Sequence, residues 1–416
     1  MFPGFSAALS ALTAESNAID VSGNNLANLN TPGFKAAQVE FSDLMSETLG
    51  GSVNPAQIGM GVGPIQTSTN YIQGAITTTN GPFDAAIEGN GFFVVQGQNG
   101  QTLYTRDGSF QVDSAGNLVT ANGQNVQGWP ATNGTVNANG PLSNLTVPLG
   151  TQVPGTATTT MSLDVNLDAT ATSGSGSSFS APIQVYDSLG ASHTLTVDFT
   201  NTGTNAWTYT VTVPAADLSS GGNTTLATGS LTFDGNGNLT SPAAGSGPQT
   251  VAITGLADGA NNMSIGWNLF GASGSSNITQ LAETSSLESE TQNGAAPGQI
   301  TNVSLQNGGL LVANYSNGQQ VTVGQLAMAS IQNPESLLSV GENNLQASGA
   351  TAPVVVGAAN SGGNGQILGG ALEGSTSDMA TEFTNLLTYE RSYQAAGRVI
   401  TTGDQMMQDT LSLIQG

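Results

Sequence analysis

The chain contains no cysteine, one histidine and almost no positive charge. Without cysteine, disulfides, thiolate metal sites and cysteine nucleophiles are all excluded. Four Lys and Arg residues stand against 27 Asp and Glu residues, so the 416-residue chain has a formal net charge of -23. Neutralising phosphates requires clustered Lys and Arg, so this balance argues against binding to nucleic acid and to anionic membrane surfaces.

The four basic residues stand only near the two ends of the chain. They are Lys35, Arg106, Arg391 and Arg398, and residues 107–390 contain no Lys or Arg. A long acidic and polar interior of this kind is typical of a surface that faces water, where self-repulsion opposes clumping.

Export and membrane signals are also missing. Residues 1–10 lack the positive first region and the continuous apolar region of a secretory signal peptide. No run approaches the roughly 18 apolar residues of a membrane span. These absences predict a protein that is cytoplasmic or is exported without a cleaved signal peptide. The length favours two or three domains, because single hydrophobic cores stop growing at roughly 250–300 residues.

Helical periodicity is clear only at the two ends of the chain, where apolar residues recur at spacings of three and four. Ser375 and Asp378 have capping-box spacing before the C-terminal stripe. A helix over residues 378–415 would span about 57 Å. The N-terminal stripe is Phe2, Phe5, Leu9, Leu12, Ser16, Ile19, Gly23 and Leu26. The C-terminal stripe is Met379, Phe383, Leu386, Glu390, Tyr393, Gly397, Ile400, Asp404, Met407, Leu411 and Ile414.

Either stripe alone is equally typical of an ordinary helix that faces a core. Two stripes at opposite ends of a β-type interior instead favour a pair of terminal helices from which the interior is looped out. Glu390 and Asp404 on the stripe, with Gly397 and Gly403 in the helix, suit a tight two-stranded coil poorly. The pattern therefore predicts several packing neighbours around each helix, or a solvent-lined channel on one side.

The interior is predicted to be β-rich. Residues 27–70 have little periodicity, which predicts a linker or extended arm. Residues 131–180 and 215–250 are low-complexity tracts of Thr, Ser, Gly and Ala. Elsewhere, short apolar runs are punctuated by Asn-Gly or Asp-Gly, a strong hairpin signal. Their alternation favours antiparallel sheets with one wet face. The runs are 91–95, 103–104, 117–120, 183–186, 193–199, 207–213, 230–233, 263–267, 299–305 and 310–313.

No pattern in the chain points clearly to catalysis. His193 could form a triad with Ser192 and Asp187, but no nucleophile-elbow sequence surrounds them. The alternative, an exposed histidine on a strand, is the interpretation we prefer. We therefore predict no catalytic residue.

Candidate ligand sites are equally weak. Residues 234–239 begin like an EF-hand loop but lack the glycine at position six and the bidentate glutamate at position twelve, so a hairpin turn is expected, as at 113–117. Residues 59–63 are glycine-rich but follow no buried strand and precede no helix. Glu288 and Glu290 stand in a polar run that reads as a solvated linker. No cofactor or metal site is predicted, and the chain is expected to be non-enzymatic.

Four separated blocks resemble the rod and hook family of flagellar axial proteins, in the family's order. The resemblance covers both ends and much of the first β region. The blocks are 20–28 with 30–35, 87–95, 104–110 continuing through 116–119 to 128–129, and 370–373 with 382–385, 390–394 and 399–402. The chain departs from the family at Tyr389-Glu390, where Ala-Gln is common, and at Gly397 and Gly403.

The resemblance implies a mainly β fold with α-helical termini, in which antiparallel barrel-like or sandwich-like β domains loop out from a coiled-coil pair of N- and C-terminal helices. The helices would be disordered before assembly and would line a central channel afterwards. The expected organisation is a helical assembly domain (1–28 and 371–416), an arm (29–70 and 366–370), an inner β domain (71–145 and 297–365) and an outer inserted β domain (146–296).

Within the family, the chain length and the insert favour a hook subunit, which forms a curved, flexible tube that transmits torque from the rod to the filament. The implied partners are further copies of the chain, the rod, hook-cap and hook–filament junction proteins, and the flagellar type III export apparatus. Its place would be the extracellular hook. Alternatives are a distal rod or junction protein, a secreted acidic β-rich adhesin and, third, a secreted β-fold hydrolase.

The expected assembly residues are the larger apolar members of both stripes. They are Phe5, Leu9, Leu12, Ile19, Leu26, Phe383, Leu386, Tyr393, Ile400, Met407 and Leu411. Arg391 and Arg398 lie one heptad apart, and two interpretations stay open for them: pairing with acids of neighbouring subunits, or a solvated face.

Overall fold

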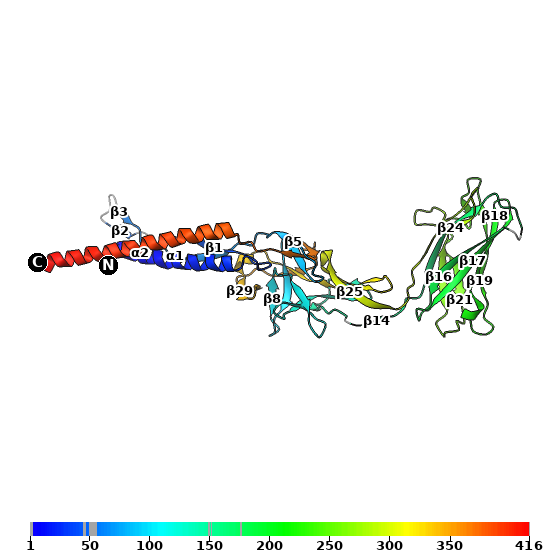
Figure 1. Cartoon of the computed structure of the whole chain (residues 1–416), viewed down its shortest axis with the longest axis horizontal. Coiled ribbons are helices and arrows are strands. Elements are labelled where there is room, and N and C mark those ends of the chain that lie inside the picture. Colours follow the sequence, from blue (N-terminus) through cyan, green and yellow to red (C-terminus); the bar gives the residue numbers. More distant parts are fainter. Residues whose placement is uncertain are drawn as a thin grey trace. The chain divides into compact units, whose positions relative to one another are not determined.

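The computed structural model describes residues 3–44, 47–49, 56–148, 150, 152–174 and 177–415. Among the described elements, one long α-helix comes first along the chain, another comes last, and short strands lie between them in sequence (Figure 1). The chain divides into two compact units. The terminal unit comprises Met1–Leu149, Val303–Ala313 and Val321–Gly416, and the sandwich unit comprises Gly150–Asn302 and Asn314–Gln320.

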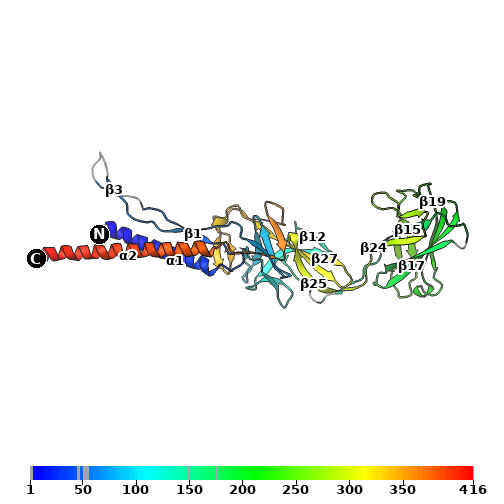
Figure 2. The ribbon, with the colours of Figure 1, turned by 45° about the horizontal axis from the view of Figure 1, so that its top comes forward.

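The two helices of the terminal unit are α1 (Pro3–Ala27) and α2 (Met379–Gln415). They lie side by side and antiparallel in both views (Figures 1 and 2). Asp378 caps α2, because its Oδ1 accepts a 2.8 Å hydrogen bond from the backbone N–H of Thr381. With 37 residues against 25 in α1, α2 is the longer helix and spans about 56 Å. Neither helix combines the length and hydropathy that crossing a membrane requires.

The β part of the terminal unit is built on one large sheet, with strand order β14-β25-β26-β27-β11-β7-β8-β30-β29 along its main path. Its first strand, β14 (Gln152–Val153), pairs with the start of β25 and lies in the sandwich unit. The strands before the sandwich unit are β1 (Ala37–Glu40), β2 (Glu47–Leu49), β3 (Ala56–Ile58), β4 (Gln66–Thr69), β5 (Ile76–Thr78), β6 (Ala85–Glu88), β7 (Phe92–Gln96), β8 (Thr102–Thr105), β9 (Phe110–Val112), β10 (Leu118–Thr120), β11 (Asn125–Thr132), β12 (Thr135–Val136) and β13 (Ser143–Asn144). Those after it are β25 (Gly298–Gln306), which begins in the sandwich unit, β26 (Leu310–Tyr315), β27 (Gln320–Leu326), β28 (Met328–Ser330), β29 (Leu338–Gly341), β30 (Asn344–Gln346), β31 (Val355–Gly357), β32 (Gln366–Gly369) and β33 (Ala371–Glu373), with the short helices η2 (Asn307–Gly309) and η3 (Pro334–Ser336).

Aromatic and aliphatic side chains fill the core of this β part. Phe93 is fully buried and packs edge-on against Phe110, with ring centroids 5.1 Å apart. The Trp129 side chain is buried, and its Nε1–H donates a 3.0 Å hydrogen bond to the carbonyl oxygen of Gly140. This donation satisfies the one polar group of the indole, as buried tryptophan requires.

Two segments that were predicted as arm contain strands. Between α1 and β5, β1 pairs with β4 and β2 pairs with β3, both antiparallel. Near the other end, β32 pairs with β6 and β33 pairs with β5. Residues 371–373, predicted in the helical segment, are therefore strand, because Ala371 is buried in the sheet and the helix begins only after the Asp378 cap.

The sandwich unit packs two sheets face to face. One is an antiparallel meander in the order β16-β17-β18-β19-β20, and the other has the order β21-β22-β15-β23, with β24 also paired to β15. Their shared core includes Phe199, Trp207 and Trp267. The elements are β14 (Gln152–Val153), β15 (Thr160–Asp168), β16 (Ser178–Tyr186), β17 (Ser192–Gly203), β18 (Ala206–Thr212), η1 (Ala215–Asp217), β19 (Thr225–Phe233), β20 (Leu239–Ser241), β21 (Gln249–Ile253), β22 (Met263–Asn268), β23 (Ile278–Leu281) and β24 (Ser286–Gln292).

Most of the strand pairs that the structure describes are antiparallel, as the alternation predicts. Strand β15 runs parallel to both β22 and β23.

The two expected hairpin turns are confirmed: Asp113 accepts backbone hydrogen bonds from Ala115 and Asn117, and Asp234 does the same from Asn236 and Asn238. Hydrogen bonds from the side chain and backbone of Asn117 to Asp113, and from the backbone and side chain of Asn238 to Asp234, hold the pKa of both carboxyl groups below the usual value. The run with Glu288 and Glu290 is exposed as expected, but it is strand β24 and not a linker.

Candidate assembly surface on the terminal helices

The face that α1 turns toward the rest of its unit carries small side chains. Ala8, Ala18, Ser22 and Asn25 are buried there, with 7%, 0%, 3% and 1% of their surface exposed. Each stands one residue before a member of the predicted stripe. One residue corresponds to about 100° around a helix, so the stripe lies on a different face. Of the large side chains of that stripe, Leu9 is 52% exposed and Phe5, Leu12, Ile19 and Leu26 are half-buried.

Helix α2 shows the same rotation. Its least exposed positions include Glu382, Asn385, Tyr389 and Ser392, each again one residue before the predicted stripe. Leu386 and Ile400 of the stripe are half-buried. The exposed members include Phe383 (53%), Tyr393 (43%), Met407 (40%) and Leu411 (59%). The most buried positions of both helices therefore stand beside the predicted stripes, and the stripes are only partly covered by the chain's own packing.

An apolar groove lies where the start of α1 meets the last turns of α2. Its volume is about 780 Å³. Residues from both ends of the chain line it, namely Gly4, Phe5, Arg398, Val399, Thr402, Gly403, Met406, Met407, Thr410 and Leu411. A contiguous apolar surface of this kind marks a site of interaction with another protein or ligand.

Several glycines of the two helices make no close contact within the chain. A Cβ atom added at Gly23, Gly397 or Gly403 would meet no atom within 4 Å, beyond its own helix neighbours. Each glycine costs about 1 kcal/mol of helix stability relative to alanine. Because no contact within the chain requires them, these glycines leave open space on the helix surfaces.

The two helices are held together at their base by Asn25. Its Nδ2 donates to Glu382 Oε1 at 3.0 Å and to the carbonyl oxygen of Ala37 at 2.7 Å. Its Oδ1 accepts from the backbone N–H of Ala37 at 3.0 Å. One side chain thus connects the end of α1, strand β1 and the start of α2.

Lys35, Arg106 and Glu373 form a buried ion cluster, which we call the motif ion cluster. Lys35 Nζ lies 2.6 Å from Glu373 Oε1, and Arg106 Nη1 lies 3.0 Å from Oε2. The three side chains are at most 6% exposed. Burial lowers the pKa of Lys35, and the hydrogen bond and charge of Glu373 oppose this shift. Each residue comes from a different block of the family resemblance.

Backbone groups complete the motif ion cluster. Gly74 N–H donates to Glu373 Oε1 at 2.8 Å, and Arg106 Nη2 donates to the carbonyl oxygen of Gly89 at 2.8 Å. Gly33 has a φ of 68°, and a Cβ there would lie 2.5 Å from the Arg106 backbone. No local sequence pattern predicted this pairing, although the scarcity of basic residues was a signal that two of them have a common acidic partner.

Arg391 and Arg398 are exposed on α2. Within the part of the chain that the structure describes, neither forms an ion pair. Arg398 lines the apolar groove. Both interpretations of these residues therefore stay open.

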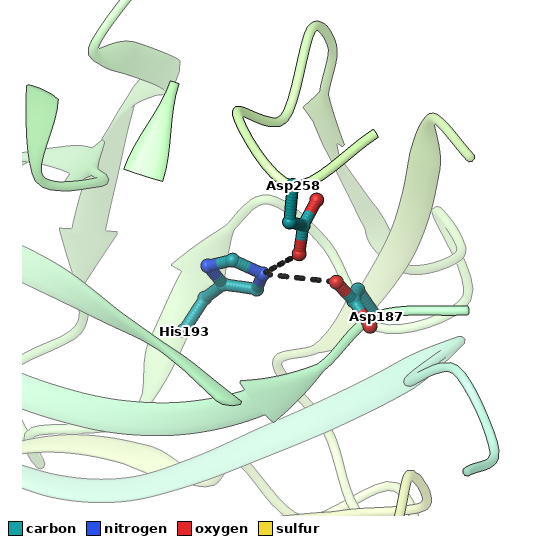
Figure 3. Close-up of side chains that lie close together, drawn as sticks. All are labelled: Asp187, His193 and Asp258. Atoms are coloured by element: carbon teal, nitrogen blue, oxygen red, sulfur yellow. Dashed lines mark hydrogen bonds and ion pairs between the residues drawn. The ribbon is translucent and has the colours of Figure 1, made fainter. Parts of the chain in front are cut away.

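His193 lies in the sandwich unit, and the prediction that it is an exposed strand residue is wrong. Only 6% of its surface is exposed, and Figure 3 shows its ring facing the side chains of Asp187 and Asp258. Asp187 is brought within 3.2 Å of His193 Nε2. Ser192 is exposed, and successive residues of a strand point to opposite faces, so it does not join them.

Four family models match successive parts of the chain. They are a flagella basal body rod protein model at residues 5–35, the flagellar hook protein FlgE/F/G D1 domain at 86–173, the flagellar basal body protein FlaE D2 domain at 173–295, and the flagellar basal body rod FlgEFG protein C-terminal model at 368–413.

Relatives match over almost the whole length. The chain is 33% identical to the flagellar hook protein FlgE of Salmonella typhimurium over 98% of this chain and 99% of the relative. It is 32% identical to that of Treponema pallidum over 95% and 96%. The crystal structure of the Helicobacter pylori flagellar hook protein FlgE2 matches 70% of this chain and 99% of its own, with a TM-score of 0.52 and 14% identity, which supports the fold. The chain belongs to the flagellar hook protein FlgE family.

Proposed function

We propose that this chain is a structural subunit of the flagellar hook and that it polymerises through the apolar stripes of α1 and α2. The observation that carries the proposal is the position of these stripes. Phe383, Tyr393 and Leu411 are at least 43% exposed in the single chain, although their heptad spacing is typical of packed helices. Neighbouring copies are the partners that would bury them.

The proposed interface comprises the assembly residues of both stripes. Arg398 stands beside the apolar groove and Arg391 lies one heptad earlier, so both could pair with acids of a neighbouring copy. The helix glycines would admit close approach of a neighbouring helix. The expected domain boundaries, with the arm as a separate element, form part of the same proposal.

The mechanical role follows from a difference between the two units. Apolar helix contacts would keep subunits connected in the tube wall, whereas the sandwich unit would form weaker contacts outside. Charged residues make up only 7% of the chain, so few strong ion pairs could hold the outer contacts in one register. A curved tube that rotates needs such contacts to slide.

Flagellar export and assembly supply the remaining partners in this proposal. The chain would pass unfolded through the type III export apparatus without a cleaved signal peptide, and a cysteine-free chain suits that route. It would then contact the rod, hook-cap and hook–filament junction proteins outside the cell. The family is structural, and no catalytic step is part of the proposal.

Electron microscopy of basal bodies from a strain that lacks this chain tests the hook assignment. We expect complete rods that end without a hook. Truncated rods, or hooks without filaments, would instead identify a distal rod or junction protein. Intact flagella would contradict membership of the axial structure altogether.

Replacing Gly403 by alanine is expected to stabilise α2 while weakening polymerisation. The free energy of helix formation should improve by about 1 kcal/mol, because alanine is the better helix former. The added methyl group would occupy the space that we assign to a neighbouring helix. Circular dichroism melting measures the first effect, and sedimentation of polymer measures the second.

The exposed neighbour Thr401 supplies the control. Thr401→Ala also raises helix propensity, but it adds no atoms to the open space beside a helix glycine. A Gly403→Ala chain that polymerises as well as the Thr401→Ala chain would contradict the proposed role of the glycine.

A further inference from the structure

Three aspartates from three different segments converge on His193 in the sandwich unit. His193 is on β17, Asp187 follows β16, Asp217 ends η1, and Asp258 lies between β21 and β22. Figure 3 shows Asp187 and Asp258 pointing toward the same edge of the imidazole ring. The Asp187 side chain is fully buried and that of His193 is 7% exposed, so both belong to the interior and not to the solvated acidic surface.

The spacing of the converging atoms matches the ligand spacing around a metal ion. His193 Nε2 lies 3.2 Å from Asp187 Oδ2 and 3.6 Å from Asp258 Oδ2. All three ligand atoms lie within 4.8 Å of one another. Two ligands that are each about 2.1 Å from a tetrahedral ion lie about 3.4 Å apart. The observed distances lie on either side of this value.

The other oxygen of each carboxylate is already held by the backbone. Asp187 Oδ1 accepts hydrogen bonds from the N–H groups of Leu189 and Ala191, at 2.8 and 2.9 Å. Asp258 Oδ1 accepts one from Ala260 at 3.0 Å. Only the Oδ2 atoms therefore remain to face the imidazole, and their directions are set before any ligand arrives.

The opposite side of the ring faces a third carboxylate. Asp217 Oδ2 lies 3.2 Å from His193 Nδ1, although this nitrogen has no partner in hydrogen-bonding geometry. A histidine that ligates a metal through Nε2 commonly donates its Nδ1–H to such a carboxylate. The backbone N–H of Ala257 donates to the Asp217 carbonyl at 2.9 Å, which links the η1 and Asp258 segments.

The cluster has little positive charge of its own. Residues 150–302 contain no Lys or Arg, so His193 is the only side chain of that range that can carry positive charge. A proton on His193 would supply one positive charge to three carboxylates that lie within 3.6 Å of its ring. A divalent cation supplies two charges and leaves the imidazole neutral.

We propose that Asp187, His193 and Asp258 bind one divalent cation of the zinc class, with Asp217 orienting the imidazole. A nitrogen ligand beside carboxylates favours Zn²⁺ over Ca²⁺ and Mg²⁺, which prefer oxygen-only sites. Asp258 is 31% exposed and provides the access route from solvent. The bound ion would join the segments after β16, on β17 and between β21 and β22, and would therefore stabilise the sandwich unit.

Isothermal titration of the EDTA-treated full chain with ZnCl₂, together with thermal melting, tests the proposal. We expect one saturable Zn²⁺ site per chain, a higher melting temperature with Zn²⁺, and no comparable effect of CaCl₂. Asp258→Asn should weaken Zn²⁺ binding at least about tenfold. The asparagine retains the oxygen that accepts the Ala260 hydrogen bond, so folding should be preserved, which circular dichroism verifies.

The matched control is Asp234→Asn, which removes the same charge from an exposed hairpin turn of the same unit and should bind Zn²⁺ like the parent chain. Two results would overturn the proposal: no saturable Zn²⁺ binding by the parent chain, or equal affinity in the Asp258→Asn and Asp234→Asn chains. In either case a protonated His193 would be the only cation of the cluster.

Discussion

Replacing Glu373 by glutamine is expected to lower the free energy of unfolding of the terminal unit by about 3–5 kcal/mol. Glutamine has nearly the same shape but no charge. The substitution leaves Lys35 and Arg106 buried, at 5% and 6% side-chain exposure, without their shared carboxylate. The loss is large because the desolvation penalty of both cations remains while their attraction to Glu373 disappears.

Urea titration with hydrogen exchange in peptides that cover β5 and β33 measures this loss separately from the sandwich unit. Glu335→Gln is the control, because Glu335 is exposed in the same unit and its replacement should change stability by no more than about 0.5 kcal/mol. If Glu373→Gln costs as little as the control, the motif ion cluster does not hold the family's sequence blocks together.

Replacing both Phe383 and Leu411 by serine is expected to abolish polymerisation while leaving the single chain folded. Both side chains are more than half exposed in the single chain, so their removal costs the monomer little. Full burial of such a side chain contributes about 1.5–3 kcal/mol. Because each side chain is already about half-buried in the monomer, two such losses per subunit should raise the critical concentration for polymerisation at least about tenfold.

Light scattering against chain concentration measures this threshold. Leu189→Ser is the matched control, since Leu189 is 58% exposed in the sandwich unit and outside the stripes. A double variant that polymerises at the same concentration as the control would contradict the assignment of Phe383 and Leu411 to the interface.

Local patterns predicted the helices and many strands. The heptad spacing and Asp378 identified α2, and strict alternation identified β17 and β18. Strand β15 was missed because it lies in a Thr/Ser/Gly tract, although Met161, Leu163 and Val165 alternate inside it. Its parallel pairing depends on strands β22 and β23, which are far away in the sequence.

The clusters of charged residues could not be predicted because they join distant segments. Lys35 follows α1, Arg106 follows β8 and Glu373 ends β33, so the cluster joins three segments that are far apart in the sequence. The prediction for His193 failed for the same reason. Strand alternation indicates that the His193 side chain lies on one of the two faces of the sheet. It does not indicate that the segments with Asp217 and Asp258 cover that face.

The heptad pattern also predicted the apolar stripes without predicting what they face. Small side chains such as Ala18 and Ser22 take the most buried face of α1, and the larger apolar side chains are half-buried or, like Leu9, exposed. A periodicity analysis weights residues by hydrophobicity, so it finds the stripe of large side chains and not the inner face of small ones.

Burial of the stripes in the polymer is the central claim, and maleimide labelling of a single cysteine tests it most directly. The chain has no cysteine, so Leu411→Cys introduces one reactive thiol, and cysteine is apolar enough for assembly to continue. We expect rapid labelling of the monomer and strong protection in the polymer, with Leu189→Cys as the reference for the sandwich unit. Equal labelling of Leu411→Cys in monomer and polymer would contradict the account.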